Sequence, residues 1–396
     1  MPPALEDNGP EDNEDWNGWR GSRRDGLVTW LPDQLPGKEA ILWTKRMSSG
    51  VLGGVAATRE CVIVADRDPA DRVDIFRCLN ADGSDRWTLR YLAPGQLDYG
   101  NSPRATAVVL EDLAILSGAQ GHLHAVELAS GKIRWKKHFP ADFGDPGKLA
   151  WGYCSSPLWT GGKLIINPGG PQASLVALEP ASGNVVWKTP GRPPGHGSLV
   201  AATLAGRQQI VGYDDTTLGG WDVATGERLW TLKPRRPGDF NVPTPLVWRN
   251  KLIVATENNG ARMYGFDVAG RIQPEAEAEN LRLVPDCQSP VLVGNRLFGV
   301  ANGLYCLNVE DGLSEVWRSK DRAFREYGSL IASSERILVT TLQGQLLLLR
   351  ADGDVFTKIS ELQLWDDEAG LYSHPAIVGN RLYVRGSQSL VCLELR

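Results

Sequence analysis

Two histidines, His122 and His124, alternate along one expected strand and therefore point to the same side of it. Imidazole is the commonest side-chain ligand of transition metals, so such a pair could take part in a metal site. No third ligand can be identified in the sequence. We therefore expect a solvated strand face and assign neither a metal site nor a catalytic residue.

Six cysteines are dispersed along the chain, with no adjacent pair and no Cys-x-x-Cys-His haem site: Cys61, Cys78, Cys154, Cys287, Cys306 and Cys392. Three of them, Cys78, Cys306 and Cys392, stand at a repeat position that is Ala or Gly elsewhere, and we predict that they are small buried fillers. Cys61 and Cys78 could face each other across antiparallel strands. The sequence alone does not establish a disulfide, and we expect both to be reduced.

Glycine turns recur along the chain at intervals of 41 to 52 residues, each Gly preceded by a small or acidic residue. These turn glycines are Gly83, Gly131, Gly183, Gly226, Gly270, Gly312 and Gly353. Such a dipeptide suits a tight hairpin because Gly accepts a positive φ. A Trp follows the Gly four or five positions later in five of the seven repeats, so an indole recurs beside a recurring turn.

Short apolar strands flank each of these turns, and four strands per repeat of 40–50 residues fit the blade of a β-propeller. Eight such units can be counted, but the last one, residues 372–396, has only three strands. We predict that residues 41–46 supply its fourth strand and close the ring, which hides the free sheet edges. The expected fold is all-β: one eight-bladed propeller of four-stranded antiparallel blades over residues 41–396, preceded by an irregular segment over residues 1–40.

Two units depart from the tryptophan pattern, because Pro274 and Thr357 stand where the indole is expected. The acidic segment 275–279 follows Pro274 directly. We predict a looped or weakened outer strand at that place.

The formal charge of −5 is unevenly distributed, since residues 1–15 hold six acidic residues and no Lys or Arg. The remainder carries about +1, which offers no wide basic face for duplex DNA, so we expect no nucleic-acid partner. The acidic start is typical of a solvated, disordered tail. No run of about 18 apolar residues predicts a membrane span, and the N-terminus lacks a secretory signal pattern.

A propeller gathers the first strands of all its blades around one central channel, whose mouth is the default ligand site. The polar and aromatic residues that we expect there are Tyr99, Asn101, Trp151, Tyr153, His196, Asn241, Gln288, Tyr327, Tyr372 and His374. Aromatic rings can stack on planar ligands or peptides, and amides and imidazoles can orient them. The alternative is that these side chains only solvate and seal the channel.

The repeat resembles the pyrroloquinoline-quinone-like (PQQ-like) family, which includes quinoprotein alcohol dehydrogenases and the outer-membrane assembly lipoprotein of Gram-negative bacteria. The pattern Ala-Leu-x-x-x-(Ser/Thr)-Gly-x-x-x-Trp carries the resemblance and is clearest at Ala177 to Trp187. The segments 16–26 and 372–385 look like the ends of non-enzymatic repeat proteins abundant in planctomycetes. In the family the tryptophan docks between blades, which implies that role for Trp43, Trp87, Trp135, Trp187, Trp230 and Trp317.

We expect a non-catalytic scaffold that binds a protein, peptide or cell-envelope component through its loops and channel face, as a monomer and without a cofactor. One alternative is a dehydrogenase dependent on PQQ and calcium, which the dispersed cysteines disfavour. Another is a glycan-binding propeller that uses exposed Trp and Tyr on the same face. The resemblance also implies a periplasmic or exported location.

Overall fold

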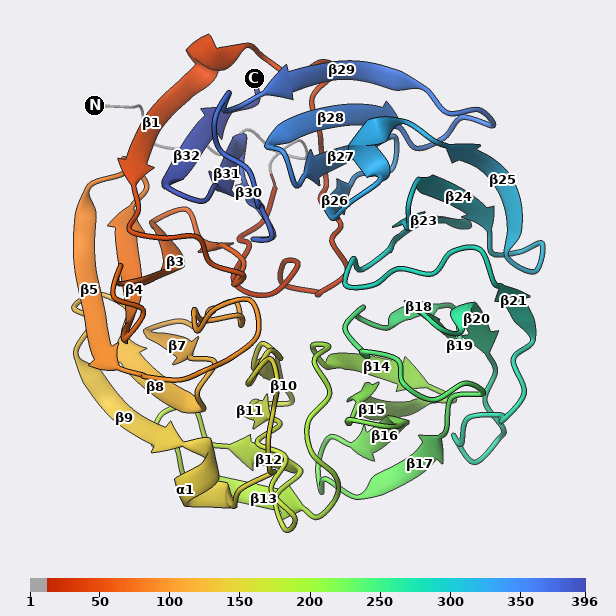
Figure 1. Cartoon of the computed structure of the whole chain (residues 1–396). Helices are drawn as coiled ribbons and strands as arrows, with labels where there is room; N and C mark the ends of the chain where they lie inside the picture. Colours follow the sequence, from red (N-terminus) through yellow and green to blue (C-terminus); the bar gives the residue numbers. More distant parts are fainter. Residues whose placement is uncertain (1–12) are drawn as a thin grey trace.

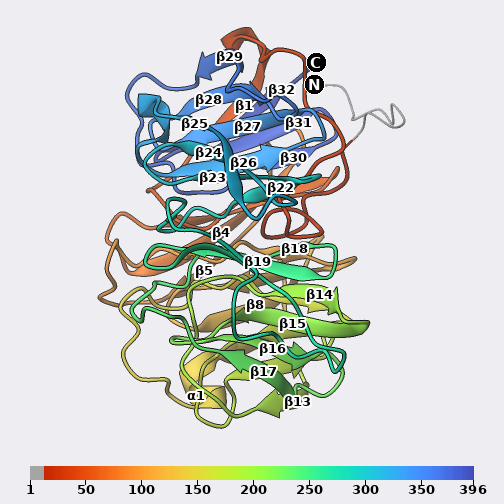
Figure 2. The ribbon, with the colours of Figure 1, turned by 90° about the vertical axis from the view of Figure 1, so that its right-hand side faces the viewer.

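The computed structural model of the chain describes residues 13–396. Eight four-stranded antiparallel sheets stand around a common centre as the blades of a ring (Figure 1). Figure 2 views this ring from its edge and shows a disc that is thinner than it is wide. The predicted eight-bladed propeller is confirmed. Of the acidic tail expected over residues 1–15, residues 1–12 lie outside the described residues, and Glu14 and Asp15 are exposed.

Each blade is a meander that runs from an innermost strand at the ring centre to an outermost strand at the rim. The first four blades contain β2 (Ala56–Ala57), β3 (Cys61–Arg67), β4 (Val73–Asn80), β5 (Asp85–Leu92); β6 (Val108–Val109), β7 (Leu113–Ser117), β8 (His122–Glu127), β9 (Ile133–His138); β10 (Leu158–Thr160), β11 (Lys163–Ile166), β12 (Leu175–Leu178), β13 (Val185–Thr189); and β14 (Val200–Leu204), β15 (Arg207–Tyr213), β16 (Leu218–Asp222), β17 (Arg228–Leu232). The other four contain β18 (Leu246–Trp248), β19 (Lys251–Thr256), β20 (Gly260–Tyr264), β21 (Ala278–Asn280); β22 (Val291–Val293), β23 (Arg296–Val300), β24 (Leu304–Asn308), β25 (Ser314–Ser319); β26 (Gly328–Ala332), β27 (Arg336–Thr341), β28 (Gln345–Arg350), β29 (Lys358–Gln363); and β30 (Ala376–Val378), β31 (Arg381–Arg385), β32 (Ser389–Glu394), β1 (Ile41–Arg46).

Helical structure is confined to the short helix α1 (Phe139–Phe143) and the 3-10 turns η2 (Lys38–Ala40) and η3 (Arg322–Phe324) within residues 13–396. None of these helices could reach across a lipid bilayer. The middle two strands of each blade are almost wholly buried, because neighbouring sheets pack face to face through them.

The ring is closed by β1, the strand nearest the N-terminus, which pairs antiparallel with β32 at the outer edge of the last blade. Trp43 lies opposite Cys392, and Arg46 lies opposite Ser389. The prediction that residues 41–46 complete the C-terminal blade is confirmed. First and last blades thereby become ordinary neighbours, and the hydrogen-bonding edge of β32 is paired.

Outer-strand tryptophans join five of the eight blades to the next one. Trp87 Nε1 donates a 2.8 Å hydrogen bond to the carbonyl of Leu128, which lies in the outer turn of the following blade. The indole ring packs on Gly131 of that turn, where an added Cβ would approach Trp87 to 2.7 Å. Equivalent bonds join Trp43 to Ala81, Trp135 to Pro180, Trp187 to Val223 and Trp317 to Gly353. The turn glycines Gly83, Gly131, Gly183 and Gly226 thus serve two purposes, a positive φ and a flat seat for the indole of the preceding blade.

Small residues stand opposite the indoles on the neighbouring strand of the same blade. Trp87 pairs with Cys78, Trp317 with Cys306 and Trp43 with Cys392, whereas other blades place Ala125, Ala177 or Gly220 there. These three cysteines have no exposed surface, so their prediction as buried fillers is confirmed. All six cysteines, each among the described residues, are free thiols, including Cys61 and Cys78.

Two of the other three blades make a different contact at this position. Trp230 Nε1 donates to Gln209 Oε1 of its own blade at 2.7 Å, and Gln209 Nε2 donates onward to Gly270 of the next blade. The following blade lacks the indole, and there Asn280 Nδ2 donates to the carbonyl of Leu313 at 3.0 Å. Its outer strand β21 has three residues, Ala278–Asn280, so the predicted weakening near Pro274 is confirmed. Residues 275–277 lie outside any strand, whereas positions 278 and 279 belong to β21, so the prediction of a loop is wrong for those two positions.

The two histidines of β8 do lie on one side, with parallel rings whose centroids are 6.4 Å apart. The expectation of a solvated face is wrong for His124, which is only 5% exposed. Tyr91 of the preceding blade covers the pair, with its ring centroid 4.9 Å from His122 and 4.5 Å from His124. Burial lowers the pKa of both imidazoles to about 4, so they are neutral packing groups near pH 7.

Candidate functional site

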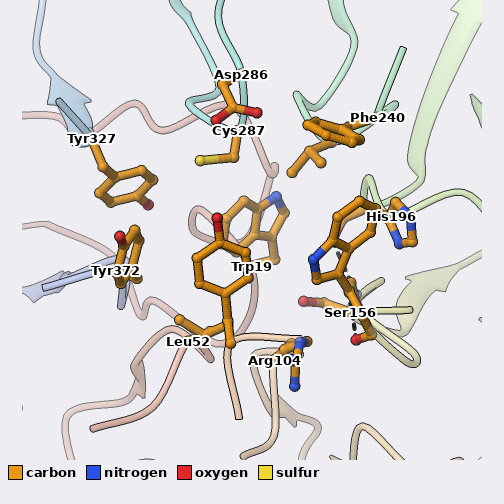
Figure 3. Close-up of a pocket in the computed structure, with 15 residues that line it drawn as sticks. Trp19, Leu52, Arg104, Ser156, His196, Phe240, Asp286, Cys287, Tyr327 and Tyr372 are labelled. Carbon is orange, nitrogen blue, oxygen red and sulfur yellow. Dashed lines mark hydrogen bonds between the residues drawn. The ribbon is translucent and has the colours of Figure 1, made fainter. Parts of the chain in front are cut away.

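The segments that lead into the innermost strands converge at the ring centre on one face of the disc. They surround a cavity of about 260 Å³, shown in Figure 3. Every blade contributes to its wall, which consists of Leu52, Tyr99, Arg104, Trp151, Cys154, Ser156, His196, Ser198, Phe240, Val242, Asp286, Cys287, Tyr327 and Tyr372, with Trp19 behind them. We call this hollow the channel mouth.

Trp19 forms the floor of the channel mouth (Figure 3). Its Nε1 donates to Thr244 Oγ1 at 2.8 Å, and its ring meets the edge of the His374 ring at a centroid distance of 5.4 Å. Trp16 stacks on His374 at 5.8 Å. The imidazole is therefore held between two indoles below the cavity.

Residues 13–30, which we call the plug, fill the channel beneath this floor and reach all eight blades. Main-chain hydrogen bonds join Trp16 to Ala57, Asn17 to Val109 and Val28 to Ala332, and the Asn13 side chain bonds Gly379. Trp19 reaches Thr244, and two arginines reach the remaining three blades. The channel is consequently a closed-ended hollow rather than a pore.

The plug arginines Arg20 and Arg24 are buried and donate to main-chain carbonyls just before the inner strands β10, β14 and β22. Arg24 reaches Leu199, Ser156 and Pro157 at 2.8–3.1 Å, and Arg20 reaches Pro290. Burial lowers the pKa of Arg24 to about 9 and that of Arg20 to about 10. Both guanidinium groups therefore tie the plug to the blades through hydrogen bonds, and Arg24 links two neighbouring blades.

Aromatic rings line most of the cavity wall. Trp151 meets His196 and Phe240 edge to face, at centroid distances of 4.9 and 4.8 Å. Tyr327 and Tyr372 form a tilted pair at 5.3 Å on the opposite side. Edge-to-face contacts are a favoured geometry of aromatic pairs, so the rings support one another before any ligand arrives.

The single cationic group in this wall, Arg104, is engaged by the protein itself. Its guanidinium donates to the carbonyls of Ser102, Asp98 and Gly100, and burial lowers its pKa. Asp286 in contrast is exposed at the rim. Burial raises the pKa of the adjacent Cys287 thiol to about 12, with a further contribution from the Asp286 charge. The accessible charge at the mouth is therefore negative.

Five of the ten residues predicted for the mouth line the cavity: Tyr99, Trp151, His196, Tyr327 and Tyr372. The other five, Asn101, Tyr153, Asn241, Gln288 and His374, are buried beside or beneath it. Asn101 donates to Asp71, Asn241 donates to the carbonyls of Asp214 and Asp215, and Gln288 accepts from the Cys287 amide. Tyr153 packs on Phe139, and His374 lies between the two plug indoles.

Sequence reasoning missed Trp19, Phe240 and Asp286, which line the cavity. Phe240 is the neighbour of Asn241, and Asp286 is two positions before Gln288. These residues lie in loops, where strand alternation does not hold. Asn241 has a left-handed φ of 53°, so residue spacing does not show which neighbour faces the cavity. Trp19 gave no signal because it precedes the repeats.

Residues 13–396 contain no group of three or more His, Cys, Asp or Glu side chains placed to hold a metal ion. His196 has its pKa lowered to about 4, first by burial and then by the Arg104 charge. It is thus a neutral hydrogen-bonding group near pH 7.

Comparison with known proteins gives a consistent picture. The family described as outer membrane protein assembly factor BamB matches residues 33–147 and 143–359. The outer membrane protein assembly factor BamB of Shewanella oneidensis is 23% identical, with 66% of this chain and 77% of that protein covered.

Two solved structures extend the likeness to the fold. BamB from Moraxella catarrhalis has a TM-score of 0.59 at 19% identity, covering 89% of this chain and 99% of that one. Quinohemoprotein alcohol dehydrogenase ADHIIG from Pseudomonas putida HK5 has a TM-score of 0.64 at 11% identity, covering 96% and 80%. At these identities the structural matches show a shared propeller architecture.

Proposed function

The chain belongs to the family of the outer membrane protein assembly factor BamB, and from this premise we propose that it is a non-catalytic scaffold in the assembly of outer membrane proteins. In this role the channel mouth and its surrounding loops bind a protein partner. The observation that carries the proposal is the channel mouth itself, an aromatic hollow to which all eight blades contribute and which the plug closes from beneath. Such a site offers a preformed surface for binding.

Quinoprotein dehydrogenases share the propeller, so the fit of their cofactor needs testing against the residues present. Pyrroloquinoline quinone is a planar polyacid, and the carboxylates of a buried polyacid need free cationic partners. Arg104 is the one cationic side chain that lines the mouth, and its guanidinium already donates to three carbonyls. Asp286 would repel the ligand. The residues do not fit this group, which favours a binding role without a cofactor.

One experiment addresses the enzymatic alternative directly. The purified protein is titrated with pyrroloquinoline quinone and calcium, and dye-linked oxidation of alcohols is followed. We expect no saturable binding and no turnover. Saturable binding accompanied by alcohol oxidation would overturn the scaffold proposal.

A second experiment addresses partner binding in the cell. A photoreactive phenylalanine replaces Tyr99, which is 75% exposed at the mouth, and in a matched variant replaces Ile133, which is 42% exposed on an outer strand. We expect a defined protein adduct from position 99 in the envelope fraction and none from position 133. Adducts from position 133 alone would contradict binding through the mouth.

The proposed location is the periplasmic side of the cell envelope, in agreement with the outer membrane role that the relatives' names state. Fractionation of the native host tests it. Recovery of the protein in the cytoplasmic fraction alone would contradict the assignment.

A further inference from the structure

The channel mouth combines two features that point to a particular ligand chemistry. Its wall carries aromatic rings on several sides, from Phe240 on one side to Tyr327 and Tyr372 on the other (Figure 3). Trp151 packs edge to face against Phe240. The faces of such rings are electron-rich and attract cations, most strongly when the cation is shielded from water. The floor ring, Trp19, adds an indole, which is the best aromatic partner for a cation.

Carboxyl groups without a basic partner surround the same mouth. Asp286 lines it, Glu257 accepts a 3.1 Å hydrogen bond from the amide of the lining residue Phe240, and Glu326 directly precedes the lining residue Tyr327. No salt bridge joins any of these three acids to a base within the part of the chain that the structure describes.

The raised pKa of Glu257 indicates that the mouth lacks a positive charge. Its pKa is raised by burial and further by the charges of Asp286 and Asp239, while the Phe240 amide partly offsets this. A cation entering the mouth would relieve this repulsion between acids. Arg104 does not supply that charge, because its guanidinium is bound to three carbonyls. Aromatic faces and unpaired acids therefore favour the same kind of guest.

We propose that the channel mouth receives an Arg or Lys side chain carried on a segment of the partner protein. This inference rests on the proposed scaffold function and names the group that the scaffold recognises. A protein-borne cation is favoured over a small free one because part of the aromatic wall is exposed at the rim. Tyr99 is 75% exposed and Phe240 is 39% exposed, and a peptide chain entering with its side chain would cover both.

Isothermal titration calorimetry at low salt tests the charge requirement on the full-length protein. The probes are acetylated, amidated pentapeptides with a central arginine between glycines, and the same peptide with citrulline, which keeps the shape and removes the charge. We expect saturable one-site binding of the arginine peptide and at least about tenfold weaker binding of the citrulline peptide. Equal affinity for the two peptides would overturn the proposal.

Two variants place the binding at the mouth. Asp286→Asn removes the rim charge, and Phe240→Leu keeps apolar volume but removes an aromatic face; each should weaken the arginine peptide by about three- to tenfold. Glu111→Gln is the matched control, because Glu111 is an exposed acid in the turn after β6, on the opposite face of the disc. Thermal melting of all three variants should match the parent. Unchanged affinity in both mouth variants would refute the assignment.

Further measurements distinguish a cation on a partner segment from a small free cation, and they test the cation proposal separately from the scaffold function. N-acetyl-arginine amide should bind more weakly than the pentapeptide, and equal affinity would mean that the mouth takes a small organic cation instead of a partner segment. Neutral oligosaccharides should not compete, and competition would indicate a glycan site. A protein adduct from position 99 together with equal binding of arginine and citrulline peptides would defeat the cation proposal and leave the scaffold function standing.

Discussion

Replacement of Gly131 by Ala tests the contact that joins one blade to the next. Gly131 has φ +71°, and an added Cβ would come within 2.7 Å of the Trp87 ring and 2.9 Å of Trp87 Cβ. The left-handed backbone costs an alanine about 1 kcal/mol. The indole adds a second cost, because Trp87 is only 8% exposed and its N–H is bound to Leu128. Overpacking of this kind costs about 1–3 kcal/mol, so the sum is about 2–4 kcal/mol.

Gly162 supplies the matched control, with φ +72° and no neighbouring atom within 4 Å of the place that a Cβ would take. Gly162→Ala should therefore lower the free energy of unfolding only by the backbone cost, about 1 kcal/mol. Urea unfolding followed by circular dichroism measures the free energy of unfolding of both variants. A double-mutant cycle with Trp87→Ala completes the test. In that background Gly131→Ala should also cost only about 1 kcal/mol, giving a coupling of about 1–3 kcal/mol.

Equal destabilisation by Gly131→Ala and Gly162→Ala, within about 0.5 kcal/mol, or a cycle without coupling would refute the docking contact. Either result would mean that the indole does not seat on the turn. The blades would then have to be joined mainly by the packing of their buried strands.

Other predictions concern the plug and the docking tryptophans. Arg24→Met should lower the free energy of unfolding in urea by about 3–5 kcal/mol because three buried carbonyls lose their donor. Arg23 forms an exposed pair with Asp25, so the control Arg23→Met should change stability by less than about 1 kcal/mol. Similar losses in the two variants would mean that the Arg24 hydrogen bonds do not link the blades. Burial holds the pKa of His374 at about 3, below its ordinary 6.5, so the unfolded chain binds the extra proton between these values and stability falls as pH falls. Between pH 7 and pH 5 the parent should lose about 2 kcal/mol more than His374→Gln, and equal losses would mean that this imidazole is accessible to protons. Trp87→Ala should cost about 3–5 kcal/mol, and a loss under about 1 kcal/mol would show that the ring is not a packing element.

The ring could be predicted because its determinants are local and repeated. A turn glycine followed at a fixed distance by Trp87 or Trp135 marks the outer edge of a blade, and the missing fourth strand of the last unit identified β1 as the closing strand. Even the irregular blade was predictable, since Pro274 cannot donate to a sheet ladder and β21 begins only after it.

The plug could not be predicted, because its partners are scattered over the whole chain. Arg24 bonds residues more than a hundred positions away, and Arg20 reaches Pro290. Nothing periodic in the sequence distinguishes such arginines from surface ones. The location of the channel mouth was predicted, but only five of the ten residues predicted for it line the cavity. Which of two neighbours, Phe240 or Asn241, faces the cavity depends on loop backbone, and Asn241 adopts a positive φ of 53°.

Hydrogen–deuterium exchange tests the central claim most directly, that the aromatic mouth of a plugged ring is the surface that meets the partner. Exchange is measured on the protein alone and bound to the outer membrane assembly machinery isolated from its host. We predict that binding slows exchange in the mouth segments around Tyr99, Trp151, Phe240 and Cys287, with outer strands such as β9 and β13 unchanged. Slower exchange confined to the outer strands, with the mouth segments unaffected, would contradict the account.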